Sequence, residues 1–325
     1  MTAFGMLVKS YGADFDYAAR LIDSYRDHNV TGIPLVFVVP DLDTKAFGEF
    51  ADETVTVLPE STFAEHLTAT DRGGYLSGYL NQAVIKLCFW EIGIFDNYLC
   101  LDSDAEFIRD FRVGDFMADT TVPYTFLSED AELISEPEYY QSQWQYRESR
   151  LMAIKDEIGV TERRLLTVHG HAVFSAAVLR SFRDNFLVPR GWDYIDALSF
   201  SPYEPTWYNM WLQHDHTIPT VMREPIFKTF HNASQHLEYL LHEVTKEEMA
   251  RGYVGIIVNS NYSRGGGVVS VDDPRAQTLA TYVGFGDLAR AAIYSAWWRL
   301  TFRGAFISGL RHRIGALLGR GPREG

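Results

Sequence analysis

The stretch Asn97-Tyr-Leu-Cys-Leu-Asp-Ser-Asp104 decides the fold class. It is a short apolar run that ends in two carboxylates, Asp102 and Asp104, where a buried strand is expected to end. Carboxylates at positions i and i+2 of an extended backbone project to the same side, so both can reach one cation. Such oxygen ligands suit Mg²⁺ or Mn²⁺, which also bind substrate phosphates. Because ligands collect at the carboxyl ends of strands in open α/β sheets, the stretch predicts a metal–diphosphate site in an α/β fold.

The residues before this stretch alternate between expected strands and helices. Strands are expected at residues 4–8, 34–39 and 54–58, and the continuous apolar run at 34–39 is typical of a strand buried on both faces. Apolar side chains recur on one face at residues 14–27 and 77–94, which predicts two helices. Strands and helices in this order imply a mainly parallel sheet with right-handed crossovers. Residues 1–115 are therefore expected to form a nucleotide-binding α/β part.

The second half of the chain is less regular. Strands are expected at residues 164–168, 226–230 and 254–258, and a helix at 174–185. No linker is evident before residue 284. One continuous domain over residues 1–284 is therefore expected, with residues 116–284 as its second part and residues 285–325 as a separate tail.

The charge of the chain is strongly negative and unevenly distributed. The net charge is −14, and from residue 299 onward six arginines and one glutamate give +5, which leaves −19 for residues 1–298. An acidic body argues against nucleic acid as a partner. The N-terminus lacks the basic and apolar regions of a signal peptide, and the two cysteines lie in apolar contexts, so a cytoplasmic protein with buried thiols is expected.

Six short segments, in this order along the chain, carry a resemblance to a known family. They are Val8-Lys9-Ser10-Tyr11, Asn81-Gln-Ala-Val-Ile-Lys86-Leu87, Tyr98-Leu-Cys-Leu-Asp-Ser-Asp104, His169-Gly170-His171, Pro202-Tyr-Glu-Pro-Thr-Trp-Tyr-Asn209 and Phe230-His231-Asn232. Over residues 1 to 260 the chain resembles GT-A glycosyltransferases, specifically a little-characterised bacterial branch. The resemblance implies a GT-A-like (Rossmann-like) fold with a mixed, mainly parallel sheet flanked by helices. It also implies a metal-dependent enzyme that uses a UDP- or GDP-sugar.

The resemblance further implies which residues hold the donor and its metal, Mn²⁺ or Mg²⁺. Asp104 would bind the metal directly, Asp102 would contact the ribose or bind the metal through water, and His231 would supply a third ligand. The remaining donor-binding candidates are Lys9, Ser10, Tyr11, Asp41, Gln82, Lys86 and Ser103. Lys86 could pair with a phosphate or with the carboxylates after the strand. For each of these residues a structural alternative stays open, such as a turn, a helix cap or a solvated side chain.

The acceptor side is expected around the aromatic segment at residues 202–209. Glu204 is the first candidate for a catalytic base, with Asp193 and Asp196 as rivals, because an inverting enzyme needs a carboxylate near the acceptor hydroxyl. His171 is a third catalytic candidate, with a packed histidine as the alternative. The residues expected to contact the acceptor are His169, Tyr203, Trp207 and Tyr208.

The C-terminal tail, residues 285–325, is basic and rich in aromatic and aliphatic side chains. Such a segment resembles an interfacial helix on anionic lipid, with a packed terminal helix as the alternative. The membrane interpretation predicts a peripheral protein on the inner face of the cytoplasmic membrane, with a glycan or lipid-linked acceptor. Two other functional classes stay open, an aspartate-nucleophile phosphotransferase and a catalytically silent glycan- or nucleotide-binding module.

Overall fold

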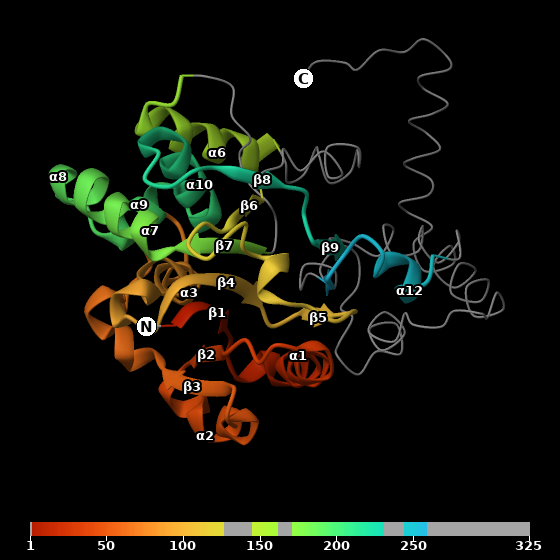
Figure 1. Ribbon diagram of the computed structural model, residues 1–325. Coiled ribbons are helices and arrows are strands. Elements are labelled where there is room, and N and C mark those ends of the chain that lie inside the picture. The colour runs from red at the N-terminus through yellow and green to blue at the C-terminus, as the bar shows by residue number, and fades with distance from the viewer. Residues whose placement is uncertain (1, 127–144, 162–170, 231–243, 259–325) are drawn as a thin grey trace, which may run out of the picture. The chain divides into compact units, whose positions relative to one another are not determined.

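The computed structural model describes residues 2–126, 145–161, 171–230 and 244–258 (Figure 1). The chain divides into two compact units, Met1–Thr229 with Gly252–Ile257, and Phe230–Arg251 with Val258–Gly325. Most of the second unit lies outside the described residues, apart from the short helix α12 (Lys246–Met249) and its neighbours. The fold and the site below therefore belong to the first unit. The expected boundary at residue 284, the tail and the expected strand at 164–168 lie outside the described residues.

The centre of the first unit is a five-stranded sheet in the order β3-β2-β1-β4-β7. Its strands are β1 (Thr2–Lys9), β2 (Leu35–Val39), β3 (Val55–Pro59), β4 (Phe95–Asp102) and β7 (His171–Ser175). The first four pair in parallel, and β7 pairs antiparallel with β4. The expected α/β class with a mixed, mainly parallel sheet is confirmed.

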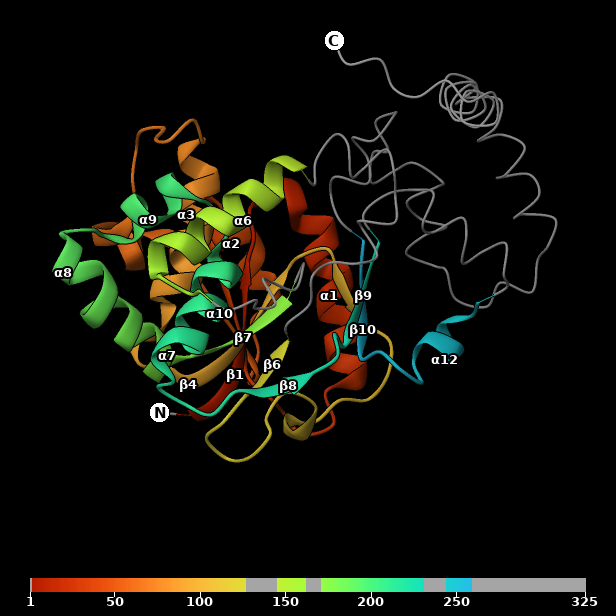
Figure 2. The same cartoon turned by 90° about the horizontal axis from the view of Figure 1, so that it is seen from above.

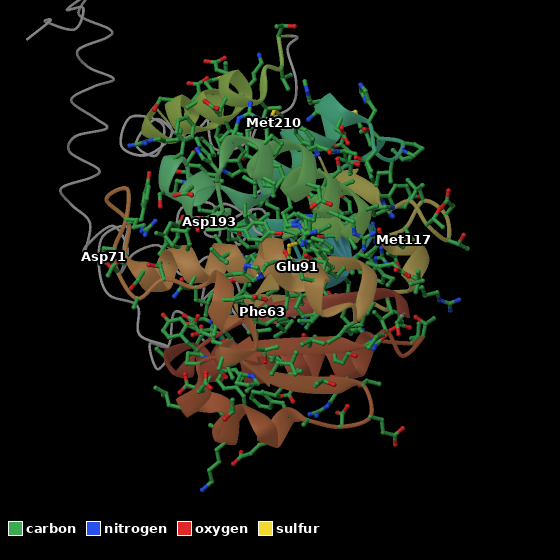
Figure 3. The ribbon with its side chains drawn as sticks, turned by 90° about the vertical axis from the view of Figure 1, so that its left-hand side faces the viewer. Phe63, Asp71, Glu91, Met117, Asp193 and Met210 are labelled. Atoms are coloured by element: carbon green, nitrogen blue, oxygen red, sulfur yellow. The ribbon has the colours of Figure 1, made fainter. Side chains whose placement is uncertain are left out.

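Helices cover both faces of this sheet (Figure 2). Alternate residues of β1 face opposite ways, because Met6 and Val8 pack in one buried cluster and Leu7 packs in the other. The cluster around Met6 and Val8 also contains side chains of the helices α1 (Phe15–His28) and α2 (Thr44–Phe47). The cluster around Leu7 contains Phe63 and Met210, which are both labelled in Figure 3. Its helices are α3 (Ser77–Cys88), α6 (Gln145–Ile158), α7 (Ala176–Ser181), α9 (Tyr194–Phe200) and α10 (Glu204–Asp215).

Smaller elements extend from the edges of this core. A three-stranded sheet has the order β5-β10-β9, and β6 pairs in parallel with β8. Their bounds are β5 (Ala105–Phe107), β6 (Tyr124–Phe126), β8 (Val221–Arg223), β9 (Phe227–Phe230) and β10 (Gly255–Val258). The short helices are η1 (Gly12–Asp14), η2 (Asp41–Asp43), η3 (Gly48–Phe50), η4 (Glu60–His66), η5 (Phe89–Ile92), η6 (Val113–Asp115), the π-helical η8 (Phe182–Leu187) and α8 (Val188–Arg190).

Two expected helices differ from the observed ones. The helix expected over 77–94 ends as an α-helix at Cys88 and continues as η5, and Gly93 follows with a left-handed φ of 67°. Gly93 stops the helix because glycine adopts this conformation without strain. The helix expected over 174–185 is wrong at its start, because Phe174 and Ser175 belong to β7. No helix of the described residues is long and apolar enough to cross a bilayer.

Candidate active site

The carboxyl ends of β1 and β4 lie side by side at the point where the strand order reverses. From β1 the chain continues outward to β2 and β3, whereas β4 pairs on the opposite side of β1. The register pairs Lys9, the last residue of β1, with Asp102, the last residue of β4. In open α/β sheets, ligands bind at such a switch point. The side chains that follow these two strands therefore form the candidate site.

Three predicted residues meet here from three different elements. The Nζ atom of Lys86, on α3, donates hydrogen bonds of 2.9 Å to Asp102 Oδ1 and of 2.9 Å to Glu204 Oε1. Glu204 is the first residue of α10, and Pro205 in the first turn favours the start of a helix there. Burial alone would lower the pKa of Lys86, but the Asp102 and Glu204 carboxylates raise it well above its usual value. The ammonium therefore stays charged and fixes both carboxylates.

The two carboxylates differ in their access to solvent. The side chain of Asp102 is 37% exposed, whereas that of Glu204 is 13% exposed. Lys86 binds one oxygen of each group. Asp102 can therefore offer its other oxygen to a ligand at the edge of the sheet.

The residues at the end of β1 form the other side of the site. Lys9 lies 2.7 Å from Glu60 Oε1 and donates a hydrogen bond of 2.7 Å to the Ser10 carbonyl oxygen. Burial lowers the pKa of Lys9 in spite of Glu60. The buried Ser10 hydroxyl has no hydrogen-bond partner among the residues that the structure describes. Tyr11, directly after it, is about half exposed.

Asp14 also belongs to this site, although the sequence did not single it out. The hydroxyl of Ser103 donates a hydrogen bond of 3.2 Å to Asp14 Oδ2. Burial raises the pKa of Asp14, the Ser103 hydrogen bond opposes this shift, and Asp102 adds to it. An aspartate just before a helix is ordinarily a cap. The only available signal was its position five residues after the end of the first strand.

Two further donor candidates lie nearby on their own elements. Gln82 lies one turn before Lys86 on α3 and is half-buried. Asp41 follows β2 at the same edge of the sheet, where its carboxylate accepts a hydrogen bond of 3.1 Å from the Ser61 N–H. Hydrogen bonds from Ser61 lower the pKa of Asp41, which also borders an open hollow beside β3. This hydrogen bond agrees with the alternative that Asp41 stabilises a turn.

The structure describes two of the three metal candidates, Asp102 and Asp104. Strand β4 ends at Asp102, and Ser103 and Asp104 form a turn before β5. The argument from an extended backbone is therefore wrong for Asp104. No group of three or more His, Cys, Asp or Glu side chains in the described ranges is arranged to hold a metal ion. His231 lies outside the described residues, as does His169.

Comparison with known proteins gives a family for the chain. A model described as a family of unknown function, DUF6492, matches residues 10–247. The chain belongs to this family. No curated protein matches the sequence. Among solved structures, the apo form of mouse xyloside xylosyltransferase 1 is similar with a TM-score of 0.46 and 12% sequence identity, and the match covers 81% of this chain and 99% of that chain.

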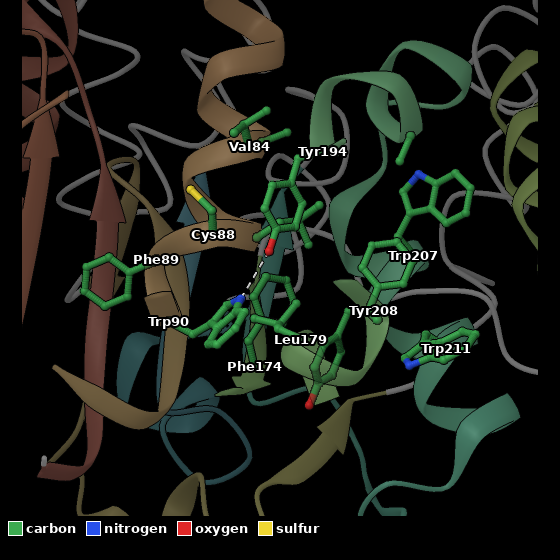
Figure 4. Close-up of a cluster of buried hydrophobic side chains, with 14 of the residues drawn as sticks. Val84, Cys88, Phe89, Trp90, Phe174, Leu179, Tyr194, Trp207, Tyr208 and Trp211 are labelled. Atoms are coloured by element: carbon green, nitrogen blue, oxygen red, sulfur yellow. Dashed lines mark hydrogen bonds between the residues drawn. The ribbon is translucent and has the colours of Figure 1, made fainter. Parts of the chain in front are cut away.

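Two expected acceptor residues of this DUF6492 protein lie in its core instead (Figure 4). Trp207 is completely buried, and its indole N–H donates a hydrogen bond of 2.8 Å to the Ser201 carbonyl oxygen. The hydroxyl of the buried Tyr208 accepts a hydrogen bond of 3.0 Å from the Ser175 N–H. Neither ring has a face for a sugar, so their assignment to the acceptor is wrong. Tyr203, just before α10, is half-buried.

Two expected catalytic residues of the DUF6492 protein have structural roles. Asp193 caps α9, because its Oδ1 atom accepts a hydrogen bond of 2.8 Å from the Asp196 N–H and Asp196 Oδ2 accepts one of 3.0 Å in return. This reciprocal capping box gives Asp193 a structural role, whereas its role as a base stays a prediction. His171 begins β7 and is buried between the rings of Phe126 and Phe227, with centroid distances of 5.1 and 5.0 Å. These ring contacts favour the packed-histidine alternative for His171.

Proposed function

We propose that this DUF6492 protein transfers a sugar from a UDP- or GDP-sugar to a glycan or lipid-linked acceptor. The observation that carries the proposal is the convergence of Lys86, Asp102 and Glu204 at the switch point of the sheet. A buried, charged amine between two carboxylates is costly to build for stability alone. Its position, where α/β folds bind ligands, favours a role in binding and catalysis. The sequence resemblance to GT-A glycosyltransferases supports the same reaction.

The donor would bind across the ends of β1 and β4. Tyr11 offers an exposed ring for the base, and Lys9 and Ser10 line the same edge. Asp104, in the turn directly after β4 and not on the strand itself, and the second oxygen of Asp102 are the oxygen ligands that would hold Mn²⁺ or Mg²⁺, with His231, outside the described residues, as a further candidate. When bound, the metal supplies charge neutralisation for the departing nucleoside diphosphate.

The acceptor would meet Glu204. The Lys86 ammonium holds this carboxylate in place, and a positioned carboxylate can accept the proton of an acceptor hydroxyl as that oxygen attacks the sugar. Glu204 and Asp102 contact the same amine, so the donor and acceptor sides of the site are directly connected. The basic tail at residues 285–325 would hold the protein on an anionic membrane where the acceptor is lipid-linked.

A donor screen tests this proposal. The purified protein is incubated with individual UDP- and GDP-sugars and Mn²⁺, and the released nucleoside diphosphate is measured. We expect release from at least one sugar nucleotide, and a loss of at least about a hundredfold in Asp104→Asn. Asp23→Asn, an exposed change on α1, is the matched control and should keep full activity. Release of inorganic phosphate in place of nucleoside diphosphate would support the phosphotransferase alternative and contradict the proposal.

A further inference from the structure

A stripe of side chains on α3 leads from the protein surface to the candidate site. Tyr79, Gln82 and Lys86 are spaced three and four residues apart, so they share one face of the helix. Tyr79 is 48% exposed, Gln82 is half-buried and Lys86 is buried against the two carboxylates. At 1.5 Å per residue, the seven steps along the helix from Tyr79 to Lys86 span roughly 10 Å. We call these three residues the α3 stripe.

A tight turn adds a second aromatic ring at the outer end of the α3 stripe. Arg72 and Tyr75 exchange backbone hydrogen bonds of 3.1 and 2.9 Å. Gly73 and Gly74, between them, have φ values of 59° and 82°, as a two-residue hairpin turn requires. The rings of Tyr75 and Tyr79 lie 6.2 Å apart at an angle of 38°. Leu76, which is 70% exposed, extends this apolar surface.

The turn is fixed to the rest of the first unit. A side chain at Gly73 would overlap the Ser199 carbonyl oxygen of α9, so the two backbones are in close contact. Asp71, which is labelled in Figure 3, accepts a hydrogen bond of 2.8 Å from the Ser77 N–H. Arg72 Nη1 lies 3.7 Å from Oδ1 of Asp196, on α9. Rings held in this way bind a ligand without the entropy cost of ordering a loop.

The chemistry of the α3 stripe selects a neutral ligand. The outer side chains of the stripe are the Tyr79 ring and the Gln82 amide, and the nearby charges of Asp71 and Arg72 already have partners. A polyanion would need unpaired cations, whereas the cation of the stripe, Lys86, is already paired with the Asp102 and Glu204 carboxylates. A protein partner would cover about 800 Å² on each side, far more than these few side chains offer. A pyranose ring fits, because its apolar face can stack on an aromatic ring while its hydroxyls bond to an amide.

We propose that the α3 stripe and Tyr75 form a subsite for the carbohydrate chain of the acceptor. One sugar ring stacks on Tyr79 beside Tyr75, the chain continues past Gln82, and its reacting end reaches Glu204. The assignment of this carbohydrate as the acceptor rests on the proposed function. The carbohydrate binding itself rests on the geometry of α3 and its preceding turn.

An array of neutral oligosaccharides, covering gluco-, manno-, xylo- and chito-series, tests the subsite with the full-length protein. We expect binding to at least one series, a loss of about tenfold or more in Tyr79→Ala, and wild-type binding in Tyr79→Phe, which keeps the ring. Leu42→Ala, at another exposed apolar residue, should bind like the wild type. Thermal unfolding of each variant should match the wild type, because Tyr79 is on the surface.

Either of two results would overturn the proposed subsite. The wild type binds none of the oligosaccharides, or Tyr79→Ala binds as tightly as the wild type. Failure of the proposed function would appear differently, as the absence of donor turnover. Glycan binding that depends on Tyr79 but occurs without any donor turnover would uphold the carbohydrate subsite and contradict the transferase.

Discussion

Lys86 Nζ and Glu204 Oε1 lie 2.9 Å apart, although 118 residues separate them in the chain. The ion pair attaches the beginning of α10 to α3, and through Asp102 to the end of β4. A cation shared by two carboxylates has structural and functional consequences that different variants can separate.

Replacing Lys86 should destabilise the protein. Lys86→Met leaves two carboxylates close together without their cation, and loss of one partner of a buried ion pair costs about 3–5 kcal/mol. Because Asp102 is partly exposed to solvent, we expect a smaller loss of about 2–3 kcal/mol in the free energy of unfolding, measured with urea.

The control for Lys86→Met is Arg26→Met. Arg26 forms an ion pair of 2.7 Å with Asp52, and its side chain is 41% exposed where that of Lys86 is 9% exposed, so its loss should cost less than about 1 kcal/mol. Equal losses in the two variants would show that the Lys86 pair is no stronger than a surface pair.

Replacing Asp193 should affect stability and leave catalysis unchanged. Asp193→Ala removes the cap of α9, which we expect to lower the free energy of unfolding by about 1 kcal/mol. Donor turnover should stay within twofold of the wild type. Asp193→Asn should retain most of the stability, because asparagine also caps helices. A large loss of turnover in a folded Asp193→Asn protein would restore this residue as a base.

The stability of the protein should depend on pH through His66. The Glu91 carboxylate, whose Oε2 lies 3.4 Å from His66 Nε2, raises the pKa of His66 above 6.5, against the effect of burial. Burial would raise the pKa of Glu91, but the neighbouring His66 and the hydrogen bond from the Tyr194 hydroxyl lower it. A raised histidine pKa contributes stability that is complete below 6.5 and is lost as the pH rises through the folded-state pKa. Glu91 stays charged throughout this range.

Unfolding measurements on the wild type and His66→Gln at about pH 5.5 and about pH 8.5 check this expectation. The difference in the free energy of unfolding between the wild type and His66→Gln should be larger at the lower pH than at the higher pH. A difference that is constant between the two pH values would mean that His66 does not stay protonated in the fold.

Much of the sheet could be predicted because its signals are local. The five residues of β2 are all buried and therefore form a continuous apolar run. Strand β4 ends at Asp102, as predicted from the two carboxylates that follow the apolar run. The contact of Lys86 with Asp102 was one of the expected alternatives, since α3 leads directly to β4.

The errors concern residues whose role depends on tertiary structure. Aromatic residues such as Trp207 and Tyr208 give the same local pattern in a core as on a sugar-binding surface. The sequence predicts a strand at residues 164–168 and a helix from residue 174, so the strand β7 that begins at His171 was not recognised. By contrast, Asp193 and Asp196 have the spacing of a capping pair, which could have identified the cap from sequence.

The most direct test of the proposed site is calorimetric titration of the protein with UDP and with GDP, each with and without Mn²⁺. Asp102→Asn is compared with Asp96→Asn, the same change at an exposed position near the other end of β4. We predict that one nucleotide binds in a Mn²⁺-dependent way, that Asp102→Asn weakens this binding at least about tenfold, and that Asp96→Asn leaves it unchanged. Equal affinities in the two variants, or no binding of either nucleotide to the wild type, would contradict a donor site at the ends of β1 and β4.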